Sequence, residues 1–152
     1  MEYRERKMRS NFHGVFSLIL ILASVAIALV YLLSLSPGWG LAYLGVILLA
    51  NPLVLYSYCA KCLCRDDACS HVLPGKLTRW LPARKQAPYT RMDYFWTALP
   101  LMVLFCFPIP WLWQSKALLL GYLLLLLTGF IEILFFVCRT CLNKNCPICS
   151  LH

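Results

Sequence analysis

The chain has 152 residues, of which 61% are hydrophobic and only 13% are charged, and its mean hydropathy is +0.72. Water-soluble domains carry about 25% charged and 45–50% apolar residues, so this composition excludes an ordinary soluble domain. The net charge is +8, and the length predicts one membrane domain over residues 1–152.

The first half of the chain contains a long uncharged interval. No Lys, Arg, Asp or Glu lies between Arg9 and Lys61, a distance of 51 residues. A helix crosses a bilayer core of about 30 Å with about 20 apolar residues, so the interval is long enough for two helices. A turn signal with Ser, Pro and Gly divides it at residues 34–40. We therefore predict helices over residues 15–35 and 41–58.

The second half repeats this plan, with predicted helices over residues 94–113 and 117–137. The link at 114–116 is very short, which predicts a tight antiparallel hairpin. The sequence thus predicts an all-α integral membrane protein: a four-helix bundle of two hairpins with a cysteine-rich loop and a cysteine-rich C-terminal tail.

The basic residues indicate the orientation of these helices. Of the 14 Lys and Arg residues, four precede residue 10, seven lie between residues 61 and 91, and two follow residue 138; the exception is Lys116. Four spans place these three segments on one side, which the positive-inside rule assigns to the cytoplasm. We expect a multi-pass protein of the plasma (inner) membrane with both termini cytoplasmic. The bilayer accounts for the positive charge, and no nucleic-acid partner is expected.

The loop at 72–93 combines Pro and Gly with basic and aromatic residues. This composition predicts an irregular segment that lies on an anionic leaflet, or one that only fixes the topology.

Eight of the nine cysteines form two clusters, at 59–71 and 138–149, directly after the second and fourth predicted helices. Both clusters begin with Cys-x-x-Cys-Leu and end with Cys-Ser, which suggests a tandem repeat of two helices and a four-cysteine tail. The helices themselves share little identity, so the duplication stays open. The predicted metal ligands are Cys59, Cys62, Cys64, Cys69, Cys138, Cys141, Cys146 and Cys149, and His71 is a candidate extra ligand.

Metal binding is the interpretation that uses all eight cysteines. Cysteines separated by two residues can turn both sulfurs toward one ion, and four thiolates complete a zinc site or hold an iron–sulfur cluster. A reducing cytoplasm disfavours disulfides, and catalytic dithiol chemistry would need only two cysteines. The spacing does not distinguish iron–sulfur from Zn²⁺, or sites within one cluster from sites shared between both. Nearby basic residues would offset the thiolate charge: Lys61, Arg65, Arg139 and Lys144.

These features predict a membrane-anchored metal protein in electron transfer or redox sensing at the cytoplasmic face. One alternative is a zinc-stapled scaffold or accessory subunit that docks a soluble partner. A second alternative is a membrane thiol–disulfide oxidoreductase, and the sequence leaves open whether the chain is an enzyme.

Three polar residues inside the predicted spans are candidates for a further role. Glu132 is the only acidic residue in a span, and it lies six residues, or about 9 Å, from the inner helix end. Charge inside a bilayer is costly and functional by default. We predict either a protonated Glu132 hydrogen-bonded to Asn51, at similar depth, or a proton-transfer path. Thr128 lies one turn away on the same face.

The layout resembles that of the membrane ferredoxin-like quinol dehydrogenases, which carry cysteine motifs at the cytoplasmic ends of even-numbered helices. Their Cys-x-x-x-Cys-Pro motif has no match in this chain. The layout is also similar to the four-helix disulfide-generating family related to vitamin K epoxide reductase, whose active cysteines lie on the extracytoplasmic side. Both resemblances concern the architecture alone and identify no family.

Overall fold

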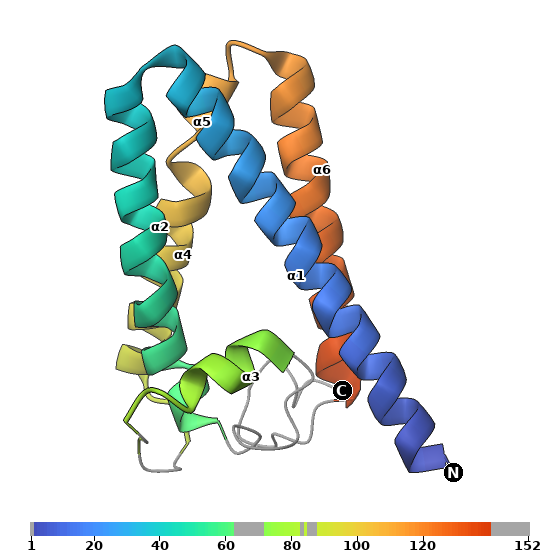
Figure 1. Ribbon diagram of the computed structural model, residues 1–152. Helices are drawn as coiled ribbons and strands as arrows, with labels where there is room; N and C mark the ends of the chain where they lie inside the picture. The colour runs from blue at the N-terminus through green and yellow to red at the C-terminus, as the bar shows by residue number, and fades with distance from the viewer. Residues whose placement is uncertain (1, 63–71, 83, 85–87, 141–152) are drawn as a thin grey trace.

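The computed structural model describes residues 2–62, 72–82, 84 and 88–140. These residues form helices and no strand (Figure 1). In chain order the elements are α1 (Glu2–Leu35), α2 (Pro37–Ser57), η1 (Cys59–Lys61), α3 (Val72–Thr78), α4 (Arg91–Cys106), α5 (Ile109–Leu112), α6 (Lys116–Glu132), the π-helical turn η2 (Ile133–Val137) and η3 (Cys138–Thr140).

The four predicted helices are confirmed as helices long and apolar enough to cross a membrane. The candidate spans cover Asn11–Leu35, Pro37–Lys61, Arg91–Leu112 and Lys116–Val137. The first helix begins earlier than predicted, at Glu2. Its first turns contain charged residues but no proline. The apolar span therefore ends there, while the helix continues through the charged residues.

The break between α1 and α2 is shorter than the predicted turn at 34–40. Ser36 alone is extended, with φ −162° and ψ 129°, and α2 starts at Pro37. Proline disfavours the helical conformation of the preceding residue, and its missing N–H costs nothing at the first helical position. Gly40 permits the sharp elbow, because a Cβ there would lie 2.9 Å from the Leu33 Cα.

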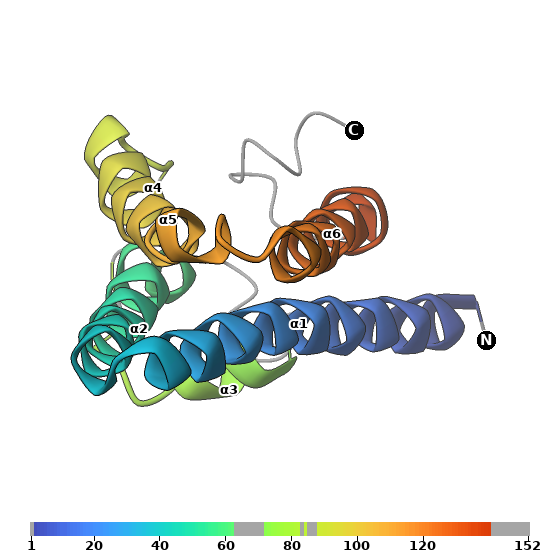
Figure 2. The ribbon, with the colours of Figure 1, turned by 90° about the horizontal axis from the view of Figure 1, so that it is seen from above.

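The helices pair differently from the prediction. Helix α6 packs mainly against α1, and α4 packs mainly against α2, while α1 also contacts α2. Figure 2 shows these two pairs side by side. The predicted tight hairpin of the last two helices is therefore wrong, although the link before α6 is short. Pro108 follows the end of α4 at Cys106 and removes a helical N–H, so the chain turns through α5 before α6 begins.

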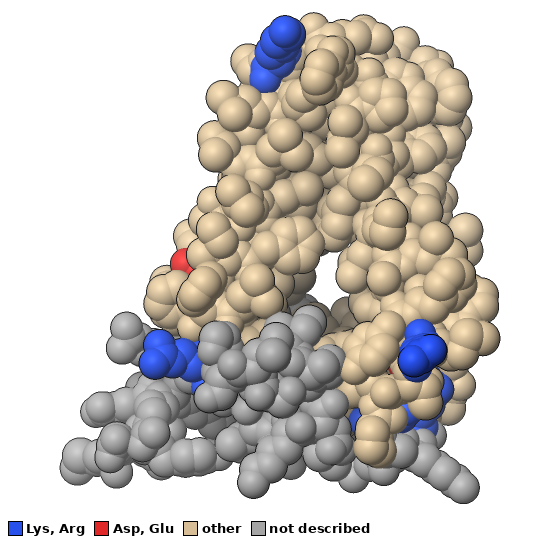
Figure 3. Space-filling model, turned by 180° about the vertical axis from the view of Figure 1, so that it is seen from behind, with Lys and Arg blue, Asp and Glu red and all other residues tan. Residues whose placement is uncertain are grey.

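A compact core lies where the two pairs meet. Its fully buried members include Leu32, Tyr43, Leu112 and Tyr122, and the Tyr122 hydroxyl donates to the Phe105 carbonyl at 2.9 Å. Many other large apolar side chains are exposed along the helices. In Figure 3 the surface between the two ends of the bundle shows almost no charged side chain, and the blue basic side chains lie at the ends.

Charge is divided between the two ends of the bundle. Lys116 begins α6 at one end, and the other described basic side chains belong to segments at the opposite end (Figure 1): Lys61, Lys76, Arg79, Arg84, Arg91 and Arg139. The loop that was predicted to be irregular contains α3 at this end. Within this loop, the Trp80 side chain is 90% exposed.

Candidate functional site

Both cysteine clusters begin at the same end of the bundle (Figure 1). Cys59 starts η1 directly after α2, and Cys138 starts η3 directly after η2. The Cys62 N–H donates to the Cys59 carbonyl at 3.1 Å, so the first Cys-x-x-Cys sequence forms a tight turn. The structure thus places both cluster starts on helix ends that face the same way.

Three of the eight predicted ligands can be located, and the side chains of Cys59, Cys62 and Cys138 are all half-buried. The remaining predicted ligands lie outside the described residues: Cys64, Cys69, Cys141, Cys146, Cys149 and His71. Within the described part of the chain, no group of three or more His, Cys, Asp or Glu residues could hold a metal ion. The ninth cysteine, Cys106, is exposed on α4, away from both turns.

Lys61, inside the first cysteine turn, has a carboxylate partner that the sequence analysis missed. Its Nζ lies 2.6 Å from Oδ2 of Asp93, and the two side chains are 7% and 3% exposed. Lys61 therefore neutralises Asp93, and its effect on the thiolate charge stays a prediction.

Asp93 holds several segments together at the start of α4. Its Oδ2 accepts the Thr90 N–H at 2.8 Å and the Thr90 hydroxyl at 2.9 Å, and the Asp93 N–H donates back to Thr90 Oγ1 at 3.3 Å. This is a capping box, which satisfies N–H groups at a helix start. Nη1 of Arg84 lies 2.9 Å from Asp93 Oδ1. The sequence Thr-x-x-Asp was the signal that could have revealed this site.

The same segment caps the end of α2. Arg84 Nη1 donates to the Ser57 carbonyl at 3.2 Å, and the Tyr89 hydroxyl donates to the Tyr58 carbonyl at 3.1 Å. The rings of Tyr58 and Tyr89 stack at 4.6 Å. The last carbonyls of a helix lack partners within the helix, so these side chains satisfy them. As a result, the cysteine turn leaves α2 from a fixed position.

Glu132 pairs with His13, a residue that the sequence analysis did not single out. His13 Nδ1 lies 2.7 Å from Glu132 Oε2, and the side chains are 19% and 17% exposed. The His13 ring also stacks on Phe136 of the π-helical turn, with centroids 4.5 Å apart. The uncharged interval was defined by the absence of Lys, Arg, Asp and Glu, and His13 lies within it. A definition that included histidine would have identified this residue.

The predicted partner of Glu132 was wrong. Asn51 is exposed on α2, and its Nδ2 donates to the Ile47 carbonyl of its own helix at 2.8 Å. The Thr128 hydroxyl likewise donates to the Leu124 carbonyl at 2.8 Å. The physical reason is the helix pairing, because α6 packs on α1 and α2 packs on α4. Gly129 allows the close approach of α6, since a Cβ there would lie 3.4 Å from the Ser17 carbonyl oxygen of α1.

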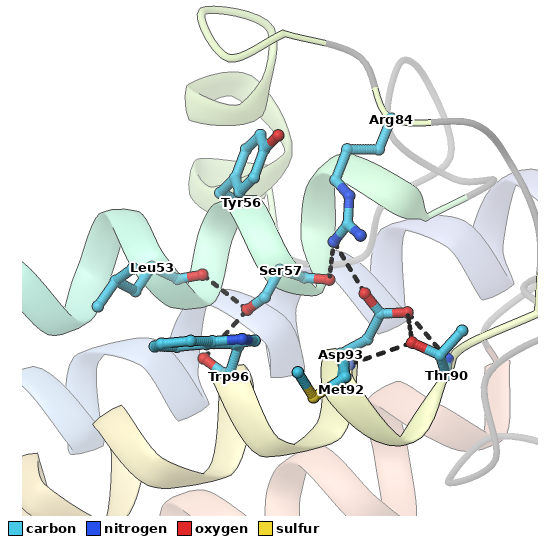
Figure 4. Close-up of a pocket in the computed structure, with 8 residues that line it drawn as sticks. All are labelled: Leu53, Tyr56, Ser57, Arg84, Thr90, Met92, Asp93 and Trp96. Atoms are coloured by element: carbon cyan, nitrogen blue, oxygen red, sulfur yellow. Dashed lines mark hydrogen bonds and ion pairs between the residues drawn. The ribbon is translucent and has the colours of Figure 1, made fainter.

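Beside the Asp93 cluster, an open pocket of about 430 Å³ lies between α2 and α4 (Figure 4). Arg84 and Asp93 form its polar end, and the aromatic rings of Tyr56 and Trp96 belong to its lining. The Arg84 guanidinium carbon lies 5.4 Å from the centroid of the Tyr56 ring.

Comparison with known proteins returned no match of the chain to a family model, a curated protein or a solved structure. The site must therefore be interpreted from its own chemistry.

Proposed function

We propose that this chain is a multi-pass membrane protein that carries a thiolate-ligated metal centre at the end of the bundle where both cysteine segments begin. The observation that carries the proposal is the placement of Cys59 and Cys138 at helix ends on one side of the bundle. The four helices of spanning length support the membrane part of the proposal. The surplus of basic side chains at this end supports a cytoplasmic location for it.

The chemistry of the cysteines favours a metal over other uses. Four thiolates bind zinc at about 2.3 Å in a closed tetrahedral site, and four thiolates also hold an iron–sulfur cluster. A bound cation keeps the thiolates deprotonated, which matters here because Lys61 is already paired with Asp93.

With an iron–sulfur cluster, the centre acts in electron transfer or redox sensing at the membrane surface. Anaerobic purification followed by absorbance near 400 nm and metal analysis tests this function. A broad band together with bound iron supports it. Colourless protein with stoichiometric zinc contradicts it.

With zinc, the centre acts as a structural staple that presents a docking surface to a soluble partner. The helix pairing favours this second function, because Cys59 follows α2 of one pair and Cys138 follows the α6–η2 segment of the other. A site that takes ligands from both segments would join the two pairs at the end of the bundle where they diverge (Figure 1).

Single substitutions distinguish shared sites from separate ones. In shared sites, Cys59→Ser and Cys138→Ser each lose metal from both sites. In separate sites, each variant loses about half of the metal. Cys106→Ser is the matched control, because this cysteine is on α4 away from both turns, and it should retain all metal. Full metal content in both test variants would contradict the proposed ligands.

The orientation is tested by alkylating thiols from each side of the membrane. We expect metal-free Cys59 and Cys138 to react with an impermeant reagent from the cytoplasmic side. Reaction from the opposite side alone would contradict the orientation and favour the thiol–disulfide oxidoreductase alternative.

A further inference from the structure

The pocket between α2 and α4 has an apolar part and a cationic part (Figure 4). Leu53 and Tyr56 from α2 are 41% and 44% exposed, and Met92 and Trp96 from α4 are 65% and 47% exposed. These side chains offer a hydrophobic surface to whatever lies beside the helices. Arg84 closes the pocket at the end of α2.

The depth of this pocket corresponds to a membrane interface. The second candidate span ends at Lys61 and the third begins at Arg91. The lining residues of α2 therefore lie in the last turns of one span, and those of α4 lie in the first turns of the next. Tyr and Trp are enriched at this level of a bilayer because their rings are amphipathic. A pocket at this level suits a ligand that has both apolar and polar parts.

The polar end of the pocket carries an excess of positive charge. Two cations, Lys61 and Arg84, share the single carboxylate of Asp93, which leaves one positive charge without a counter-charge in the cluster. Lys61 is buried, whereas Arg84 is 32% exposed. The excess charge is therefore accessible at the guanidinium group.

Arg84 is fixed in place and still has donors to offer. Its Nη1 contacts the Ser57 carbonyl and Asp93, while its Nε and Nη2 have no hydrogen-bond partner among the described residues. A guanidinium group binds phosphate through paired N–H groups. Because Nη1 is already held, little side-chain freedom is lost when the remaining donors bind a ligand.

We propose that this pocket binds an anionic phospholipid of the adjacent leaflet, with Arg84 donating to the lipid phosphate and an acyl chain lying along Leu53 and Trp96. The charge excess selects an anionic headgroup over a zwitterionic one, and the apolar lining selects a lipid over free phosphate. The inference rests on the membrane placement proposed above, and it is independent of the metal centre.

The test uses full-length protein in vesicles of phosphatidylcholine that contain either brominated phosphatidylglycerol or brominated phosphatidylcholine. Bromine quenches the fluorescence of nearby tryptophan. Each protein is prepared with and without Trp96→Phe, and the difference in quenching between the two reports on the pocket. One accessible cation near a membrane surface contributes about 1 kcal/mol toward anionic lipid. We therefore expect about fivefold preference for phosphatidylglycerol at Trp96.

Two variants and one control identify the source of this preference. Arg84→Gln should lower it to about one, and Asp93 would keep Lys61 and Thr90 as partners. Leu53→Trp, assayed by native mass spectrometry of bound lipid, should fill the pocket and lower lipid retention while leaving Arg84 in place. Arg139→Gln removes an exposed arginine of η3 at the same end and should keep the full preference.

Several results would overturn the lipid site: no preference in the unmodified protein, an unchanged preference in Arg84→Gln, unchanged retention in Leu53→Trp, or an equal loss in Arg139→Gln. Displacement of the lipid by inorganic phosphate alone would also overturn it, because the apolar part would then be dispensable. Failure of membrane placement is separately visible, because the protein would be released from membranes by alkaline carbonate.

Discussion

His13 and Glu132 are separated by 119 residues in sequence, and their side chains meet with Nδ1 2.7 Å from Oε2. This contact joins α1 to the end of α6 inside two candidate spans. Polar contacts between membrane helices each contribute about 1–2 kcal/mol at most. The pair therefore adds a small polar contribution to the packing of α1 against α6.

A double-mutant cycle with His13→Ala and Glu132→Ala tests this contact. We expect a coupling free energy of about 1 kcal/mol in unfolding from mixed detergent micelles, because each single change leaves a polar partner unsatisfied. Thr128→Ala serves as the control, since the Thr128 hydroxyl bonds within its own helix. Additive effects of the two alanine substitutions would show that the pair contributes nothing to stability.

Substitution of Asp93 should lower the free energy of unfolding more than substitution of Thr90, its partner in the capping box. Asp93→Asn keeps the shape of the side chain but leaves buried Lys61 without a counter-charge, which costs about 3 kcal/mol. Thr90→Ala removes part of the capping box and costs about 1 kcal/mol. Unfolding free energies of both variants check this order.

The same pair of variants should also affect the cysteine turn. Asp93→Asn should increase the alkylation rate of Cys59 more than Thr90→Ala does, since Lys61 lies within the turn. Equal rates in the two variants would argue against a role of the ion pair in positioning Cys59.

The close approach of α6 to α1 at Gly129 can be tested with a second glycine on the same helix. A Cβ at Gly129 would lie 2.9 Å from Cγ1 of Ile21, whereas a Cβ at Gly121 would have no neighbour within 4 Å. Gly129→Leu should therefore destabilise the protein by about 1–3 kcal/mol. Gly121→Leu should be neutral or slightly stabilising, because glycine disfavours helices. Similar losses in both variants would contradict the observed packing.

Removal of metal should expose the cysteine turns selectively. If thiolates ligate a metal, a chelator should increase the alkylation of Cys59 and Cys138 several-fold, because metal binding protects the ligands. The reactivity of Cys106 should stay unchanged and serves as the internal reference. Unchanged reactivity of all three cysteines would contradict the metal centre.

The helices themselves were predictable because each is a long apolar run, and Pro37 marks the break between the first two. Their pairing was not predictable in the same way. The residues of α6 are apolar on nearly every side. The sequence pattern therefore does not distinguish the face of α6 that packs on α1 from its other faces. The hairpin prediction followed the short link and failed for this reason.

The candidate site was predictable where the signal is local. The position of Cys59 and Cys138 at helix ends follows from the sequence, and so does the cap at Thr90. The contacts of Lys61 with Asp93 and of Glu132 with His13 depend on which helices are neighbours. The sequence alone identifies Glu132 as a candidate residue, but it does not show whether the partner of Glu132 is His13 or Asn51.

The π-helical turn η2 also sets the direction in which the second cysteine segment leaves the bundle. In this turn the Cys138 N–H bonds to the Ile133 carbonyl, five residues back, which accommodates one residue more than an α-helical turn. One residue corresponds to about 100° of rotation around a helix axis. Cys138 therefore faces a side of the bundle that an uninterrupted α-helix would have given to its neighbour in sequence. Deletion of a single residue within Ile133–Val137 would therefore restore an α-helical turn and leave Cys138 on the side of the bundle that it faces now.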